Sequence, residues 1–216
     1  MQHFTMLRVA GVLLGATFGF NMACLSSAYS VMASKEAPMM MYDFRALTSL
    51  DNWSESSDTV RTPGMSKGAF VIQKSQLFQR AVLFSMLNPQ PNGAGFVGFV
   101  TDDAWDLKPF SGIELKVRAQ GESFHYKVNF KHKGQKTGNE SPSYEAFYEV
   151  PKNEWTVVTL PFTEFKPYFR GQPQPDAEPL DTSAITSVTL QIHGGVYSEY
   201  KQHGTSSLEI DYIRAV

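Results

Sequence analysis

Short segments in which apolar residues alternate with polar ones, or run together over a few positions, recur from residue 68 to residue 213. Residues 113–119 (IELKVRA) show this most clearly, with Ile, Leu and Val at alternate positions and charged residues between them. A period of two residues is typical of a half-buried β-strand. Eight further segments predict strands: residues 68–72, 80–86, 95–101, 125–130, 144–150, 156–160, 185–192 and 208–213.

Turn-forming residues separate these segments at short intervals, and no window sustains the 3.6-residue period of an amphipathic helix. This spacing is typical of an all-β sandwich or barrel. Aromatic residues make up 13% of the chain, which suits the space between two packed sheets. We predict one all-β domain, a β-sandwich, over residues 42–216. Residues 31–41 are predicted to be a flexible lead-in, and residues 131–143 and 170–183 to be long polar loops.

The first thirty residues have a different character from the rest. They contain no acidic residue, Arg8 carries their one full positive charge, and an apolar run over residues 9–25 leads into small residues. This order predicts a secretory signal peptide over residues 1–30. The apolar run is near the lower limit for spanning a bilayer, so an uncleaved anchor is the alternative. We expect export to a periplasmic, lumenal or extracellular location. A mitochondrial presequence, the other reading, is usually richer in arginine.

Composition narrows the chemistry further. The chain is 42% hydrophobic and 19% charged, which is typical of a globular protein. Its net charge is −2, and no basic patch points to nucleic acid. The single cysteine, Cys24, lies in the predicted signal peptide. The predicted domain therefore has no disulfide, no cysteine-bound zinc and no thiol nucleophile.

Catalytic motifs are missing from the sequence. There is no Gly-x-Ser-x-Gly elbow, no phosphate-binding loop and no dinucleotide fingerprint. His125 and His193 fall in predicted strands and can converge, but we read them as structural histidines. Asp102, Asp103 and Asp106 follow a predicted strand; a solvated turn, a calcium site and a catalytic carboxylate pair are the readings left open. We predict a protein that is not an enzyme and has no cofactor or bound metal.

Several residues are candidates for binding a partner. Trp53 and Trp105 lie near strand boundaries, where a tryptophan either packs in the core or offers an aromatic contact. Arg170 follows an aromatic run, and an arginine beside aromatic residues is a common interface anchor; the other reading is that it braces its loop. The candidate binding residues are Trp53, Asp58, Ser66, Trp105, Arg170 and Gly171, with Asp58 and Ser66 expected to fix the first loops.

Several segments together resemble the complex I intermediate-associated protein 30 family over nearly all of residues 42–216. The segments are Trp53 with Ser57-Asp58, Gly64-Met65-Ser66, Asn92–Val97, residues 107–118 (LKPFSGIELKVR), Trp155 with Leu160-Pro161-Phe162, Arg170-Gly171, and residues 208–213 (LEIDYI). The resemblance implies a jelly-roll, galactose-binding-like sandwich without catalytic residues. It also implies a role in assembling respiratory complex I (NADH dehydrogenase).

Three functions are consistent with the sequence. The first is a non-catalytic, protein-binding assembly or chaperone-like factor whose partners are respiratory-complex subunits, as the resemblance implies. The alternative is an exported carbohydrate-binding module, which the signal peptide, the predicted sandwich and the aromatic residues favour. The third is a hydrolase that uses Asp102 or Asp103. Membrane contact is expected only through the N-terminal segment, if that segment is not cleaved.

Overall fold

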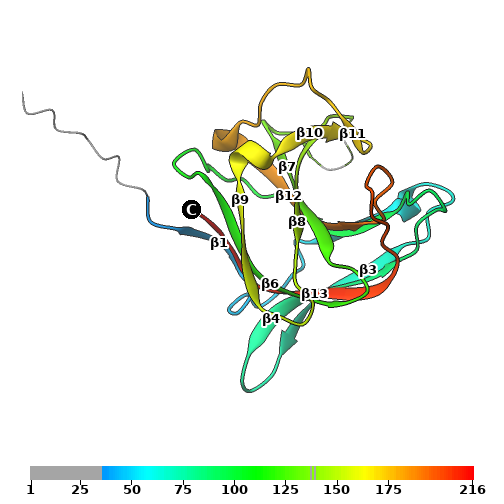
Figure 1. The fold of residues 1–216 in the computed structure, drawn as a ribbon. Helices are drawn as coiled ribbons and strands as arrows, with labels where there is room; N and C mark the ends of the chain where they lie inside the picture. The colour runs from blue at the N-terminus through cyan, green and yellow to red at the C-terminus, as the bar shows by residue number, and fades with distance from the viewer. Residues whose placement is uncertain (1–35, 137, 139) are drawn as a thin grey trace, which may run out of the picture. The chain divides into compact units, whose positions relative to one another are not determined.

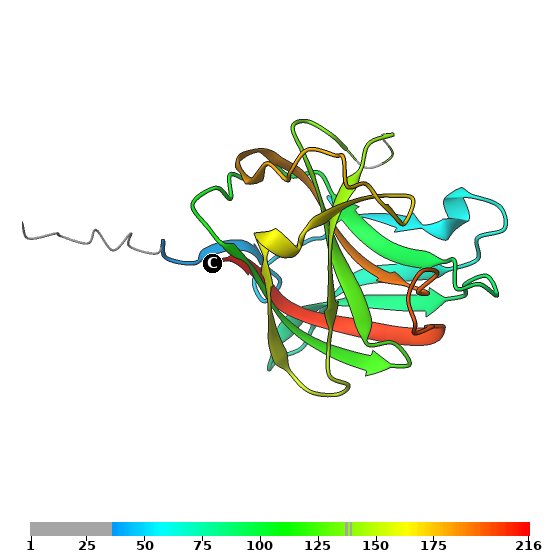
Figure 2. The same cartoon turned by 45° about the horizontal axis from the view of Figure 1, so that its top comes forward.

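Two antiparallel β-sheets packed face to face make up the fold, which confirms the predicted all-β sandwich. The computed structural model describes residues 36–136, 138 and 140–216, so the predicted signal peptide lies outside the described residues. One sheet has six strands, in the order β3-β4-β13-β6-β9 with β1 paired to β13. The other has seven, in the order β11-β10-β8-β7-β12-β5-β2. Figure 2 shows β13 (red) in the lower layer and β12 (orange-brown) in the layer above it.

The six-stranded sheet is built around its longest strand, β13 (Gly204–Ala215). One side of β13 pairs with β6 (Gly112–Gly121). Its other side pairs first with β4 (Gln79–Leu87) and then with β1 (Met39–Asp43), so that β1 lies beside the C-terminus (Figure 1). The strands at the two ends of this order are β3 (Lys67–Lys74), which pairs with β4, and β9 (Thr156–Pro161), which pairs with β6.

The seven-stranded sheet has β7 at the middle of its strand order. Its strands are β2 (Ser54–Ser57), β5 (Phe96–Thr101), β7 (His125–His132), β8 (Ser143–Glu149), β10 (Lys166–Phe169), β11 (Gln172–Pro173) and β12 (Ile185–His193). Three short 3₁₀ helices complete the described chain: η1 (Asp58–Val60), η2 (Phe162–Glu164) and η3 (Thr182–Ala184). Within the described ranges, no helix has the length and apolar character needed to cross a membrane.

Alternate side chains of both sheets fill the space between them. On β6 the inward residues are Ile113, Leu115 and Val117, which are completely buried, as their alternation predicted. Burying one such side chain stabilises the fold by about 1.5–3 kcal/mol relative to leaving it in water. Apolar residues of β7, β12, β4 and β13 meet them to form one continuous core: Tyr126, Val128, Phe130, Val188, Leu190, Ile192, Leu83, Leu208 and Ile210.

The structure contains a strand at each of the nine predicted positions and adds four short ones. Strand β2 was missed because its sequence, Ser-Glu-Ser-Ser, has no apolar residue, and β10 and β11 because they are only four and two residues long. Strand β1 begins at Met39, so the last residues of the predicted lead-in belong to the sandwich. The predicted loop over residues 170–183 likewise contains β11 and the start of η3.

Candidate functional site

Asp58 and Ser66, two of the predicted binding residues, are joined by hydrogen bonds. The Asp58 carboxylate accepts from the Ser66 backbone N–H (2.8 Å), the Ser66 hydroxyl (2.7 Å) and the Phe96 N–H (3.3 Å). The Ser66 hydroxyl in turn accepts from the Asn88 N–H (3.0 Å). Asp58 therefore ties its own segment to those of Ser66 and Phe96, which follow it by 8 and 38 residues. That the Asp58–Ser66 pair fixes the first loops stays a prediction.

Trp53 and Trp105 both pack against Tyr42. Trp53 is 8% exposed, and its ring lies 5.2 Å from that of Tyr42 in an edge-to-face arrangement. The Trp105 indole N–H donates to the Tyr42 hydroxyl (3.1 Å), which donates to Asp103 (3.1 Å). Burial raises the pKa of Tyr42 well above its usual value. Of the two readings left open by the sequence, these contacts support core packing for Trp53.

Arg170 and Gly171 form the two-residue turn between β10 and β11. Their φ angles are 53° and 77°, and two consecutive positive φ values are typical of a tight β-hairpin turn. The Gly171 position also faces the Tyr197 ring, which would lie 3.1 Å from an added Cβ. The Arg170 side chain is exposed and pairs with Glu140 at 3.0 Å. Exposed pairs of this kind contribute little stability, so the pairing leaves Arg170 accessible to a partner.

The three aspartates considered for calcium or catalysis have separate partners. Asp103 accepts from Tyr42, Asp106 accepts from the Lys108 N–H (3.0 Å), and Asp102 lies 3.7 Å from the Lys136 ammonium. In the part of the chain that the structure describes, no group of three His, Cys, Asp or Glu side chains is placed to hold a metal ion.

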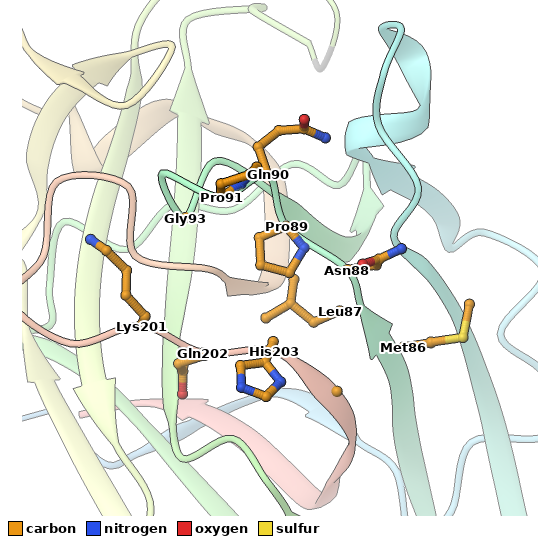
Figure 3. Close-up of a pocket in the computed structure, with 11 residues that line it drawn as sticks. Met86, Leu87, Asn88, Pro89, Gln90, Pro91, Gly93, Lys201, Gln202 and His203 are labelled. Atoms are coloured by element: carbon orange, nitrogen blue, oxygen red, sulfur yellow. The ribbon is translucent and has the colours of Figure 1, made fainter.

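An open pocket of about 540 Å³ lies between residues 86–93 and residues 201–204. In Figure 3, Leu87 and Pro89 lie between Lys201 on one side and Met86 on the other. The Lys201 ammonium donates to two backbone oxygens, those of Gly195 (2.6 Å) and Ser198 (2.9 Å). The pocket lining contains no carboxylate, hydroxyl or thiol side chain. The polar groups that it does contain mainly hold loops in place.

The hairpin of β3 and β4 carries exposed apolar side chains on its outer side. We call this set the hairpin surface: Val71, Leu77, Phe78, Phe84 and Met86, which are 50, 93, 40, 45 and 45% exposed. Figure 1 shows the turn of this hairpin projecting from the lower end of the molecule. Among the described residues β3 pairs only with β4, so in that part of the chain its other edge presents unpaired backbone groups.

A cluster of charged side chains borders the hairpin surface. The Glu209 carboxylate, on β13, accepts hydrogen bonds from Arg80, Arg118 and Gln120. Both guanidinium groups also lie over the Trp155 ring, at 4.8 and 5.1 Å from its centroid. The third tryptophan is thus part of the outer side of the six-stranded sheet. These contacts give the hairpin surface a fixed polar border.

The outer side of the seven-stranded sheet is polar yet buried. All eight residues of β7 are buried, although only alternate ones face the core. Asn129 on β7 lies opposite Glu145 on β8 and Thr189 on β12. We call this set the polar sheet face: Lys127, Asn129, Lys131, Glu145, Thr189 and Gln191, each 5–9% exposed.

Aromatic rings border the polar sheet face. We call them the aromatic row: Tyr168, Phe147, His193, Tyr200 and His125, with each ring in contact with the next. His125 and His193 do converge, because both contact Tyr200: the His125 ring stacks on it at 3.6 Å, and the His193 Nε2 lies 3.3 Å from its hydroxyl. Burial lowers the pKa of His193 to about 3, with the nearby Lys127 and His125 acting in the same direction.

Neither the hairpin surface nor the polar sheet face was predicted from the sequence as a candidate site. Phe147 gives one usable signal, because it stands on the polar side of an otherwise alternating strand. Phe84 gives another, since it extends the apolar run 81–84 onto the outer side of β4. By contrast, the six candidates chosen from the sequence lie in three local groups: Asp58 with Ser66, Trp53 with Trp105 around Tyr42, and Arg170 with Gly171.

The fold is similar to that of solved carbohydrate-binding modules. A family 11 carbohydrate-binding module from Clostridium thermocellum, in complex with a β-1,3-1,4-mixed-linked tetrasaccharide, has a TM-score of 0.59 and 16% identity, covering 83% of this chain and 95% of that one. The family 11 module of the cellulosomal cellulase Lic26A-Cel5E from the same organism has a TM-score of 0.60 and 16% identity, covering 83% and 94%. At this identity the similarity concerns the fold.

Sequence comparison identifies the family. An uncharacterised protein of Schizosaccharomyces pombe is 39% identical over 132 residues, which cover 57% of this chain and 58% of that protein. The chain thus spans less than two thirds of this relative's length. A sequence profile described as complex I intermediate-associated protein 30 matches residues 42–210, which are most of the chain. The resemblance noted in the sequence is therefore confirmed, and the chain belongs to the complex I intermediate-associated protein 30 family.

Proposed function

We propose that the protein is a non-catalytic assembly factor that binds a subunit of respiratory complex I during assembly. The hairpin surface is the observation that carries this proposal. The family's description names association with complex I intermediates, and the hairpin surface offers a place for such association. Exposed apolar groups gathered on one side of a soluble fold commonly mark a protein-binding surface.

The open edge of β3 defines how the partner would bind. An extended segment of the partner would pair with the free backbone groups of β3 and cover Val71 with its own apolar side chains. Lys67 and Lys74 stand at the two ends of β3. Lysines at an exposed edge discourage pairing between identical strands. They also favour a partner segment with acidic residues at its ends.

Catalysis has no part in this proposal. Asp102 and Asp103, the carboxylates considered for a hydrolase, contact Lys136 and Tyr42 respectively rather than each other. The pocket of residues 86–93 and 201–204 contains no carboxylate, hydroxyl or thiol side chain in its lining. We therefore propose that the protein acts by binding. It shields apolar surface of a subunit that is not yet part of the assembled complex.

Paired substitutions at the two edges of the six-stranded sheet test this function. Val71 on β3 and Val157 on β9 are almost equally exposed, at 50 and 49%, and both lie on edge strands. A charge at Val71 would enter the proposed interface, whereas one at Val157 would not. We expect Val71→Asp to reduce the complex I subunits co-purified from native membranes by at least about tenfold. Val157→Asp is expected to leave them unchanged.

Thermal melting of both variants provides the control for folding. Both substitutions replace exposed side chains, so both variants should melt close to the unmodified protein. Equal losses of complex I subunits in the two variants would contradict the hairpin surface as the binding site. Failure of the unmodified protein to co-purify any complex I subunit would contradict the proposed function itself.

A further inference from the structure

The polar sheet face contains more hydrogen-bonding groups than its own contacts use. The Asn129 amide N–H donates to the Gln191 side-chain oxygen (2.8 Å), but the buried Asn129 Oδ1 has no partner among the described residues. Buried polar atoms normally have a partner, and leaving one without is costly. Asn129 and Gln191 therefore lie side by side with unused hydrogen-bonding capacity. Each of the two residues is only 8% exposed.

Charged groups on the same face are already arranged and paired. The Lys127 ammonium lies 2.5 Å from the Glu145 carboxylate, which also accepts from the Ser143 hydroxyl (3.0 Å). The Lys131 ammonium donates to the backbone oxygen and the hydroxyl of Ser141, both at 2.9 Å. These bonds hold long side chains in fixed positions, so their remaining donors and acceptors are presented in a defined geometry.

Phe147 adds an exposed aromatic ring beside these polar groups. It lies directly opposite Lys127 in the strand pairing, and the ammonium is 5.5 Å from the ring centroid. The ring is 44% exposed and is held edge-to-face between Tyr168 (5.6 Å) and His193 (5.4 Å). An apolar ring of fixed orientation next to planar amide and carboxylate groups is a composition typical of ligand sites.

A sugar ring matches this combination. One face of a pyranose presents C–H groups that pack against an aromatic ring, and its rim presents hydroxyls that both donate and accept hydrogen bonds. Amide groups such as those of Asn129 and Gln191 also both donate and accept hydrogen bonds. Each can therefore donate a hydrogen bond to a sugar hydroxyl or accept one from it.

The charges of the face favour an uncharged ligand. Lys127 is balanced by Glu145, and Glu149 lies 3.3 Å from the His125 ring at the end of the aromatic row. Burial lowers the pKa of both His125 and His193, which favours the uncharged form of both rings. The two carboxylates and the two lysines offset each other, so the face carries little net charge to attract an acidic or a cationic ligand.

We infer that the polar sheet face and the aromatic row together bind a neutral carbohydrate chain. A sugar unit stacks on Phe147, and hydroxyls of that unit or the next one bond to Gln191, Asn129 and the Lys127–Glu145 pair. The site lies on the seven-stranded sheet, and the hairpin surface lies on the other sheet. Carbohydrate binding is thus separate from the proposed docking of complex I subunits.

Calorimetric titration with defined oligosaccharides tests this inference. The probes are neutral oligomers of glucose, xylose, mannose and N-acetylglucosamine, with an oligogalacturonate as the acidic counterpart, each raised to millimolar concentration. We expect at least one neutral oligomer to bind and the oligogalacturonate not to bind. Phe147→Ala should weaken the binding at least about tenfold. Gln191→Ala should weaken it as well, because it removes a hydroxyl-binding amide.

Phe84→Ala is the matched control, because Phe84 is 45% exposed on a strand of the other sheet. It should leave oligosaccharide binding unchanged. Folding of each variant is checked by its melting temperature, and truncation of the exposed Phe147 ring leaves the core intact. The inference is overturned if no neutral oligomer binds the folded protein, if only the oligogalacturonate binds, or if Phe147→Ala binds as well as the unmodified protein. None of these results depends on capture of complex I subunits.

Discussion

At the scale of single residues, Asp58 shows how one carboxylate can organise several loops. It accepts three hydrogen bonds, two from Ser66 and one from the Phe96 N–H. Removing the carboxylate would leave these donors without partners in a half-buried site. The loss of such a hydrogen-bonded group typically destabilises a protein by more than the loss of an exposed one.

We predict that Asp58→Ala lowers the free energy of unfolding by about 2–4 kcal/mol. Asp106→Ala is the control, because the exposed Asp106 accepts one hydrogen bond within its own turn; its effect should stay below about 1 kcal/mol. Urea unfolding of the two variants measures both values. Equal effects would contradict the bracing role of Asp58.

His193 predicts a dependence of stability on pH. Its pKa in the folded protein is lowered to about 3, chiefly by burial, whereas an unfolded histidine has its ordinary value of 6.5. Between these values the unfolded chain binds more protons, so stability is full above about pH 6.5 and falls as the pH drops towards 3. We predict that His193→Gln reduces this slope near pH 5 by up to about 1.4 kcal/mol per pH unit.

The control for this prediction is His203→Gln, which replaces an exposed histidine. Unfolding curves at pH 5, 6 and 7 should show the same slope for this variant as for the unmodified protein. An unchanged slope in His193→Gln would show that the imidazole is not kept neutral by its surroundings.

At the scale of elements, the β10–β11 turn allows two requirements for a glycine to be separated. One is a positive φ angle, and the other is the lack of room for a side chain. Gly171 and Gly134 have nearly the same φ, 77° and 76°, but only Gly171 has a neighbouring side chain, the Tyr197 ring. An alanine at either position therefore has the same unfavourable backbone conformation, which costs about 1–2 kcal/mol.

We predict that Gly171→Ala destabilises the protein more than Gly134→Ala does, because the added methyl also displaces Tyr197. Chemical denaturation measures the difference, and Gly171→Ala in a Tyr197→Ala background should remove it. If the two alanine variants are equally stable, the Tyr197 contact places no constraint on the turn.

The sheets also show which features of elements were predictable. The strict alternation of residues 113–119 predicted β6 and its buried face, because that pattern depends only on local sequence. The polar sheet face was not predictable in the same way. Asn129, Thr189 and Gln191 come from strands about 60 residues apart, and only the register of β7 with β12 brings them together. From sequence alone, a polar residue on an alternating strand is predicted to be solvent-exposed.

At the scale of the whole molecule, the two sheets would serve two binding functions through their outer sides. The six-stranded sheet carries the hairpin surface, and the seven-stranded sheet carries the polar sheet face and the aromatic row. The core between them is assembled from residues of both sheets. The sequence predicted this core because apolar periodicity is local. It could not predict which outer side carries a site, because that depends on the packing of exposed side chains.

The N-terminal segment predicts where the whole molecule is found. If residues 1–30 are a signal peptide, the mature protein should begin near residue 31 in an exported fraction. Cell fractionation followed by N-terminal sequencing of the native protein makes this measurement. Recovery from mitochondria would contradict export and would favour the proposed role in complex I assembly. The family assignment, which rests on residues 42–210, would stand in either case.

Site-specific photocrosslinking from the hairpin surface tests the central claim most directly. A photoreactive amino acid placed at Val71 should crosslink to a complex I subunit in native membranes, and the same group at Val157 should not, although the two positions are equally exposed. Mass spectrometry of the crosslinked peptides would identify the subunit and the segment that lies along β3. Crosslinking to complex I subunits from Val157 but not from Val71, or from neither position, would contradict the account.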